Sequence, residues 1–328
     1  MSRDEAIRGF LAVNGHRDSA IAPLAQDASF RRYWRLSPRP AVLMDAPPPE
    51  DVGPFLAVGS HLAALGLSVP GVAASDEAAG FVLLEDLGDA LYPSLLGSPD
   101  VAAMFDAAVD LLVAMQRETP PASLPAWGAQ EMRAAALGTL LDWWWPAAFG
   151  APAPVAARDE FSAALADTLA PLTVDMPAFV HRDFFAGNLI WLPDRAGVRR
   201  VGLLDFQSAA RGHPAYDLAS LIEDARRDIP PDIAERCVMR YLAARPELDP
   251  VRFHDALAVC KAQRHMRVAA QWVRLAQRDN RPHYLAYGPT TWRLLEAALR
   301  HPAVTPIARA FDRWIPSDMR ANPSALAA

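Results

Sequence analysis

The hydrophobic pattern of the chain changes once along its length, close to residue 88. Before this point, short runs of alternating polar and apolar residues predict strands, because successive side chains of a strand point to opposite faces. Beyond it, long Ala- and Leu-rich stretches predict helices, interrupted by a strand-rich island at residues 179–206. We therefore expect an α+β fold with two lobes: a small β-rich lobe at residues 1–88 and a larger helical lobe at residues 89–328. Ligands commonly bind between two such lobes.

The individual elements of the first lobe are predicted from runs that end at turn residues. A hairpin is expected where the alternating residues 29–36 are followed by Pro38-Arg39-Pro40 and by a second run at residues 41–44. The remaining segments have either strand-like or helix-like spacing. Strands are expected near residues 21–24, 72–74 and 80–84, and helices near 4–13, 51–65, 99–116, 129–145, 155–170 and in most of the chain beyond 215.

Two short blocks in the strand-rich island carry polar residues in a specific order. The first is His181-Arg182-Asp183-Phe184-Phe185-Ala186-Gly187-Asn188, and the second is Leu203-Leu204-Asp205-Phe206-Gln207. They fit the pattern H-R-D-x-x-x-x-N and an Asp-Phe pair at a strand end, which together are typical of phosphoryl transfer. A surface turn and a capped strand end would explain either block alone, but their order and spacing favour a single site.

Phosphoryl transfer explains why these residue types are needed. The attacking hydroxyl needs a carboxylate to accept its proton, and Asp183 is the candidate. Magnesium prefers carboxylate and amide oxygens and keeps some of its waters, so Asn188 and Asp205 are the candidate metal ligands. The expected cofactors are ATP and Mg²⁺. Asp217, at the start of a predicted helix, is either an anion that serves this site or a plain helix cap.

These blocks resemble the aminoglycoside-phosphotransferase-like small-molecule kinases, and the match is closest to the bacterial anomeric kinases of N-acetylmuramate and N-acetylglucosamine. The resemblance covers nearly the whole chain, with further matching pieces at residues 27–33, 44–51, 83–88, 142–146, 216–221 and 278–285. It implies a bilobal, protein-kinase-like fold. It also implies an ATP- and magnesium-dependent enzyme that phosphorylates the anomeric hydroxyl of these sugars in cell-wall sugar recycling.

The resemblance also implies roles for the catalytic residues. Asp183 would be the base, Asn188 and Asp205 would bind magnesium, and Asp217 would brace the catalytic loop from a helix start. His181 is interpreted as structural support, because this chemistry needs no histidine base.

On the nucleotide side, the resemblance implies contacts from two segments. The backbone from Glu85 to Leu87 would hold the adenine, and the turn that contains Ser29 would lie over the phosphates. This turn lacks the glycines that protein kinases use to cover the phosphates.

The residues that bind the phosphates must differ from those of protein kinases, which use a strand lysine paired with a helix glutamate. Lys261 is the only lysine among the 32 basic residues, and the expected strand has Met44 at the corresponding place. No glutamate beyond Glu50 precedes the following helix. We expect Arg31 or Arg32 to bind the phosphates instead, since arginine pairs well with phosphate oxygens. A solvated hairpin arginine is the alternative for either one.

Several residues are candidates for the substrate side. Arg211, just after the Asp-Phe-Gln block, is the first candidate for a substrate or phosphate contact. Trp127 and the run Trp143–Trp145 offer flat faces for a sugar, although core packing is the more common role of such residues. Four arginines fall on one helix face and suit an anionic substrate, although a solvated face is the default interpretation. They are Arg264, Arg267, Arg274 and Arg278.

Charge and cysteine content narrow the remaining function classes. The net charge is −6 and no run of basic residues exceeds two, which argues against nucleic acid as a partner. Cys237 and Cys260 have neither disulfide-framework nor metal-ligand spacing, and the charged N-terminus lacks the apolar region of a signal peptide. The longest uncharged stretch, residues 52–75, is too broken by proline and glycine to span a membrane. We expect a cytoplasmic monomer whose partner is a small sugar.

Two alternatives to a sugar kinase stay open. An aminoglycoside or other small-alcohol phosphotransferase would use the same base and metal ligands, but the arginine-rich helix suits a polycationic aminoglycoside poorly. A nucleotide-binding regulatory pseudokinase is suggested by the missing strand lysine. The presence of the base and both metal ligands speaks against a protein that only binds the nucleotide.

Overall fold

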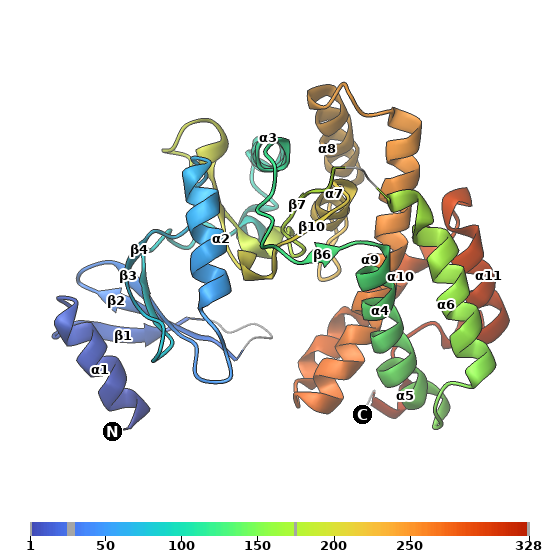
Figure 1. Ribbon diagram of the computed structural model, residues 1–328, viewed down its shortest axis with the longest axis horizontal. Coiled ribbons are helices and arrows are strands. Elements are labelled where there is room, and N and C mark those ends of the chain that lie inside the picture. The colour runs from blue at the N-terminus through green and yellow to red at the C-terminus, as the bar shows by residue number, and fades with distance from the viewer. Residues whose placement is uncertain (1, 25–29, 174–175, 327–328) are drawn as a thin grey trace. The chain divides into compact units, whose positions relative to one another are not determined.

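The computed structural model of the protein describes residues 2–24, 30–173 and 176–326 (Figure 1). In these ranges no helix is both long enough and apolar enough to cross a membrane.

Contacts along the chain divide it into two compact units. The first unit combines Met1–Leu111 with Gly187–Ser208, and the second combines Leu112–Ala186 with Ala209–Ala328. This division differs from the boundary expected near residue 88, because both the segment 89–111 and a strand pair from the middle of the chain pack with the first unit.

The first unit is built on a five-stranded antiparallel sheet in the order β1-β2-β3-β5-β4. Its strands are β1 (Ala20–Pro23), β2 (Arg32–Ser37), β3 (Ala41–Asp45), β4 (Val72–Asp76) and β5 (Phe81–Leu84). The predicted hairpin is confirmed as β2 and β3, in a register that places Arg32 opposite Asp45 and Tyr33 opposite Met44. Because side chains alternate between the faces of a strand, Arg32 and Tyr33 point to opposite sides of the sheet.

Helix α1 (Arg3–Val13) packs against one face of this sheet (Figure 1). It begins with a capping box, in which the Ser2 hydroxyl accepts from the N–H of Glu5 and the Glu5 carboxylate accepts from the N–H of Ser2. Its apolar side chains lie one turn apart and so share one face. Ile7 and Leu11 form a buried cluster with Leu36, Ala41, Leu43, Phe81 and Leu83.

A second strand pair, β8 (Leu189–Trp191) with β9 (Val201–Leu203), completes the first unit. The Leu203 N–H donates to the carbonyl of Ser68, 2.8 Å away, which ties β9 to the segment after helix α2 (Gly53–Ala64). The Phe206 ring, just past β9, stacks on Phe55 of α2 with ring centroids 4.8 Å apart. A side chain at Gly59 would meet this ring, since an added Cβ would lie 3.2 Å from it. Helix α2 therefore fixes the chain that follows β9.

The second unit is largely helical. Helix α3 (Val101–Arg117) runs from the first unit into it, and its other helices are α4 (Ala129–Thr139), α5 (Trp145–Phe149), α6 (Val155–Leu169), α7 (Ala215–Ile222), α8 (Pro231–Ala244), α9 (Pro250–Arg278), α10 (Gly288–Ala298) and α11 (Thr305–Trp314). The 29-residue α9 is central, with α4, α7 and α10 packed around it. A small sheet orders β6 (Ala126–Trp127), β10 (Ala210–Gly212) and β7 (Ala178–Val180).

The helix expected over residues 129–145 is confirmed, and it contains one turn that is wider than an α-helical turn. A single wide turn at Leu140–Trp144 separates α4 from α5. Trp144 and Trp145 are buried there, and the Trp144 Nε1–H donates to the Ala321 carbonyl at 2.8 Å. The core interpretation of these two tryptophans is therefore confirmed.

Candidate active site

The loop that carries Asp183 is held by a buried carboxylate of the second unit. Asp217, in the first turn of α7, has no exposed surface. Its Oδ2 accepts from the backbone N–H of His181 at 2.6 Å and its Oδ1 from that of Arg182 at 2.9 Å. Arg182 has φ of +74°, a strained conformation for a residue with a side chain, and these bonds help to hold it. These contacts are consistent with Asp217 bracing the loop that carries Asp183.

The electrostatic state of Asp217 reflects this position. Burial raises the pKa of its carboxyl to about 7, and the neighbouring charge of Asp183 acts in the same direction. The two backbone N–H groups and the guanidinium of Arg264 oppose this rise by stabilising the ionised form. Because Asp183 is half-buried while Asp217 is enclosed, Asp183 is the carboxylate of the pair that a substrate can reach.

His181 lies inside the second unit and away from solvent. Its ring is fully buried and meets the ring of Phe184 edge-on, with centroids 5.8 Å apart. Its backbone N–H is bonded to Asp217. This placement suits a structural role.

The two candidate metal ligands are brought together in the first unit by the β8–β9 pair. Asn188 directly precedes β8 and Asp205 comes two residues after β9. The Leu204 N–H donates to the Asn188 carbonyl at 3.0 Å, which extends the pairing to the residue before Asp205. Asp205 has φ of +59°, and its Oδ1 accepts from the Gln207 side-chain amide at 2.6 Å.

The donor set of Asn188 and Asp205 fits magnesium. One amide oxygen and one carboxylate are ligands of the hard type that this ion prefers, with the remaining positions taken by water and phosphate oxygens. Within the described ranges, no cluster of three or more histidine, cysteine, aspartate or glutamate side chains is arranged to hold a metal.

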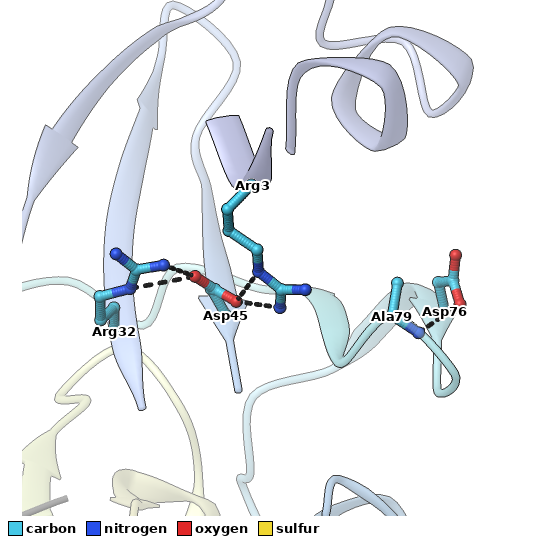
Figure 2. A network of polar contacts seen from close by, with 5 residues as sticks. All are labelled: Arg3, Arg32, Asp45, Asp76 and Ala79. Atoms are coloured by element: carbon cyan, nitrogen blue, oxygen red, sulfur yellow. Dashed lines mark hydrogen bonds and ion pairs between the residues drawn. The ribbon is translucent and has the colours of Figure 1, made fainter. Parts of the chain in front are cut away.

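Arg32 is occupied by a structural ion-pair network (Figure 2). Asp45, which is fully buried, accepts from the Arg32 Nε–H at 3.0 Å on one side and from the Arg3 Nε–H at 2.9 Å on the other. The second nitrogen of each guanidinium also contacts Asp45. These bonds tie the start of α1 to the β2–β3 hairpin.

Arg31 has different surroundings, since it precedes Arg32 and its side chain lies on the other side of the chain. It is 8% exposed, and its Nε lies 3.1 Å from a carboxylate oxygen of Glu50. Burial raises the pKa of the nearby Tyr33 to about 12; the positive charge of Arg31 opposes this rise, and the charges of Asp205 and Glu50 add to it. Arg31 and the candidate metal ligand Asp205 therefore both act electrostatically on Tyr33.

Arg31 forms an ion pair with Glu50, while Met44 stands at the place of the strand lysine. Met44 is fully buried, so the place of the lysine is apolar, and the ion pair is formed by two residues outside the strand. That an arginine takes over phosphate binding stays a prediction, and sequence reasoning missed Glu50 as the ion-pair partner of Arg31. A signal for different partners was present in the sequence, because side chains alternate along a strand and those of Arg31 and Arg32 therefore point to opposite sides.

The remaining nucleotide residues lie in the first unit. The Glu85 N–H donates to the Gly71 carbonyl at 2.7 Å, and the Glu85 side chain accepts from Arg195. The Leu87 side chain is buried, and the adenine contact expected of the Glu85–Leu87 backbone stays a prediction. Ser29, which was expected over the phosphates, lies outside the described residues.

The candidate substrate residues of the second unit have mixed outcomes. The Arg211 Nε–H, in β10, donates to the Leu124 carbonyl at 2.9 Å, so part of this side chain holds the backbone. Trp127 is buried, and the Arg182 guanidinium lies over its ring at 3.9 Å. Arg264 is only 4% exposed. The default interpretation of its helix face as solvated is therefore wrong for Arg264, because α9 is enclosed on several sides.

Sequence comparison decides the family. A model of the phosphotransferase enzyme family matches residues 20–254. This chain belongs to that family. The N-acetylmuramate/N-acetylglucosamine kinase of Caulobacter vibrioides is 37% identical to it, over 97% of this chain and 98% of the relative. The kinase of the same name from Pseudomonas aeruginosa is 34% identical, over 85% and 83%.

Solved structures confirm the predicted fold. The choline/ethanolamine kinase family protein from Mesorhizobium loti superposes with a TM-score of 0.66 at 15% identity, covering 94% of this chain and 99% of that one. The GDP complex of aminoglycoside 2'-phosphotransferase-IIIa superposes with a TM-score of 0.63 at 14% identity, covering 91% and 98%. The protein is thus a phosphotransferase with an antiparallel N-terminal sheet and a largely helical C-terminal part, in a family whose kinases bind a nucleotide.

Proposed function

We propose that this protein is an ATP- and magnesium-dependent kinase that phosphorylates the anomeric hydroxyl of N-acetylmuramate and N-acetylglucosamine in cell-wall sugar recycling. The observation that carries this proposal is the end-to-end similarity to the Caulobacter kinase of these two sugars, at 37% identity over 97% of the chain. Three further relatives that are N-acetylmuramate/N-acetylglucosamine kinases match more than four-fifths of the chain.

The proposed catalytic step uses Asp183 as the group that orients the sugar hydroxyl and accepts its proton. Asp217 would act through the backbone, since its bonds to His181 and Arg182 set the position of the loop. General-base catalysis of this kind typically contributes about 10²–10⁴ in rate. The half-buried position of Asp183 leaves it accessible to a bound sugar.

The proposed nucleotide site uses residues of the first unit. Asn188 and Asp205 would hold Mg²⁺, which when bound neutralises charge on the phosphate oxygens. Arg31, held by Glu50, would bind the phosphates through its guanidinium, and the Glu85–Leu87 backbone would hold the adenine. Glu50 would keep the Arg31 side chain in place when no nucleotide is bound.

The charge around Asp183 disfavours the aminoglycoside alternative. Arg182, Arg264 and Arg267 all interact electrostatically with Asp183. A polycationic aminoglycoside would bring further positive charge to these guanidinium groups, whereas a neutral or acidic sugar would not.

Product analysis tests the proposal. The purified protein is incubated with ATP, Mg²⁺ and either N-acetylmuramate, N-acetylglucosamine or an aminoglycoside panel, and ADP release is followed. The phosphorylated position is then assigned by phosphorus and proton NMR. We expect turnover of both sugars, with the phosphate on C1. Phosphorylation at another hydroxyl, or turnover of aminoglycosides alone, would contradict the assignment, and absence of any magnesium-dependent turnover would favour a pseudokinase.

A further inference from the structure

Three arginines of the second unit act electrostatically on the proposed base Asp183. Arg264 and Arg267 lie three residues apart on α9, and therefore on one face of that helix. Both interact electrostatically with Asp183, and so does Arg182 of the catalytic loop. The Arg267 Nη2–H donates to the Tyr216 hydroxyl at 3.4 Å. The proposed base thus lies in the electrostatic field of three guanidinium groups.

The hydrogen-bonding capacity of two of these arginines is only partly used. The Arg264 Nη1–H donates to the Glu223 backbone carbonyl at 3.2 Å, but its buried Nε has no hydrogen-bond partner among the described residues. The buried Nε of Arg267 likewise has none within these ranges. Buried polar groups are usually paired, because an unmade bond costs free energy. Arg267 is only half-buried, so part of its side chain is accessible to a ligand.

Two further acids near these arginines have other partners. Asp217 is engaged by two backbone N–H groups, and Asp224, which lies near Arg264, pairs with Arg227 at 2.7 Å. The positive charge of Arg267 lowers the pKa of both Arg182 and Arg264, in addition to the larger effect of their burial. These guanidinium groups therefore repel one another, and an anion bound among them would offset that repulsion.

We propose that Arg267, backed by Arg264, forms a subsite that binds the carboxylate of an acidic sugar whose hydroxyl is presented to Asp183. This inference rests on the proposed function, and it identifies the group that distinguishes the two sugars. N-acetylmuramate carries a lactyl ether with a carboxylate on C3, and N-acetylglucosamine has a hydroxyl there. A planar guanidinium matches a carboxylate geometrically and electrostatically.

A phosphate oxygen is the other anion that these guanidinium groups could bind. Binding of a sugar carboxylate and binding of a phosphate oxygen of ATP predict different kinetic effects of a substitution. A carboxylate subsite changes the kinetics with N-acetylmuramate selectively, whereas a phosphate contact changes KM for ATP and acts on both sugars equally. Measuring KM for ATP with each sugar separates them.

The first experiment compares Arg267→Gln with the matched control Arg278→Gln. Arg278 lies on the same helix, about 16 Å further along its axis at 1.5 Å per residue, and is exposed. For Arg267→Gln we expect the ratio of kcat/KM for N-acetylmuramate to kcat/KM for N-acetylglucosamine to fall at least about tenfold. Arg267→Lys, which keeps the charge, should recover part of this loss, and Arg278→Gln should leave the ratio unchanged. Equal losses with both sugars, or a raised KM for ATP at a constant ratio, would overturn the proposal.

The second experiment uses the unaltered protein, so it does not depend on folding of a variant. Binding of N-acetylmuramate and of its neutral carboxamide is measured by calorimetry. We expect the dissociation constant of the carboxamide to be at least about tenfold higher, and equal constants would overturn the subsite. If neither sugar is phosphorylated but the acid still binds more tightly, the proposed function fails and the subsite stands. If N-acetylglucosamine alone binds and reacts, the subsite fails and the kinase activity stands.

Discussion

The two adjacent arginines that are candidates for binding the phosphates have different partners in the structure. Arg31 and Arg32 are neighbours in a predicted strand, so sequence chemistry cannot rank them. The structure separates them, because Arg32 is bound to the buried Asp45 whereas Arg31 pairs with Glu50. The alternation of side chains along a strand is the physical reason.

The first prediction compares Arg31→Gln with Arg32→Gln. Loss of the Arg31 guanidinium should raise KM for ATP at least about tenfold, since a charged hydrogen bond is lost. Arg32→Gln should leave KM for ATP within about twofold and instead lower the free energy of unfolding by about 1–3 kcal/mol, because a buried carboxylate loses a partner. Steady-state kinetics and chemical denaturation measure the two effects. An equal change of KM in both variants would disprove the distinction.

A second prediction concerns His213, which precedes α7. Burial lowers its pKa from 6.5 to about 4, and its Nδ1 accepts from the Ala215 N–H at 3.2 Å. Because the folded-state pKa is depressed, the stability that the neutral ring contributes is present above pH 6.5 and is lost as the pH falls toward 4. This loss amounts to about 3 kcal/mol.

His213→Asn keeps an acceptor for the Ala215 N–H but does not titrate. The free energy of unfolding of this variant should therefore fall by up to about 3 kcal/mol less than that of the unaltered protein over this pH range. Denaturant titrations at a series of pH values measure the difference. Parallel pH profiles would show that His213 does not contribute to acid sensitivity.

At the scale of elements, turns and short strand pairs determine where the site residues lie. The β8–β9 pair places Asn188 beside the residue that precedes Asp205, and α2 holds the chain beyond it through Phe55 and Phe206. Periodicity predicted the long helices and the β2–β3 hairpin well. It missed β6 and β10, which have only two and three residues and are defined by partners distant in sequence.

A third prediction uses two glycines with positive φ. Gly80 has φ of +74°, and an added Cβ would overlap the Ala46 carbonyl oxygen, whereas Gly66 has φ of +75° with no heavy atom within 4 Å of the added Cβ. Gly66→Ala should cost about 1 kcal/mol through backbone strain alone. Gly80→Ala should cost clearly more, because the turn between β4 and β5 must also move. Chemical denaturation of both variants gives the comparison, and equal costs would mean that the overlap is relieved freely.

At the scale of the whole molecule, the proposed chemistry is divided between the two compact units. The first carries the candidate ligands Asn188 and Asp205 and the candidate phosphate residue Arg31, and the second carries the candidate base Asp183. Binding of nucleotide and removal of the proton are therefore expected to be separable by substitution.

The fourth prediction follows from this division. Asp183→Asn should lower kcat about 10²–10⁴-fold, while the rise in melting temperature that ATP and Mg²⁺ produce is retained, since ligand binding to the folded state stabilises it. Asp205→Asn should remove the magnesium-dependent part of that rise. Thermal unfolding with and without Mg²⁺ measures both. A fully active Asp183→Asn variant would rule out its role as base.

The sequence by itself determined the family, the α+β fold, and the order of the candidate catalytic blocks, because these depend on local spacing and periodicity. Only the tertiary structure decided that Arg31 pairs with Glu50 while Arg32 is bound to Asp45, and that Arg264 is buried and interacts with Asp183 instead of being solvated. Burial and ion pairing depend on which segments pack together, and segments distant in sequence make those contacts. For function, we therefore expect the substrate preference of this kinase to depend on Arg264 and Arg267. Helix periodicity alone would predict that both side chains are solvated.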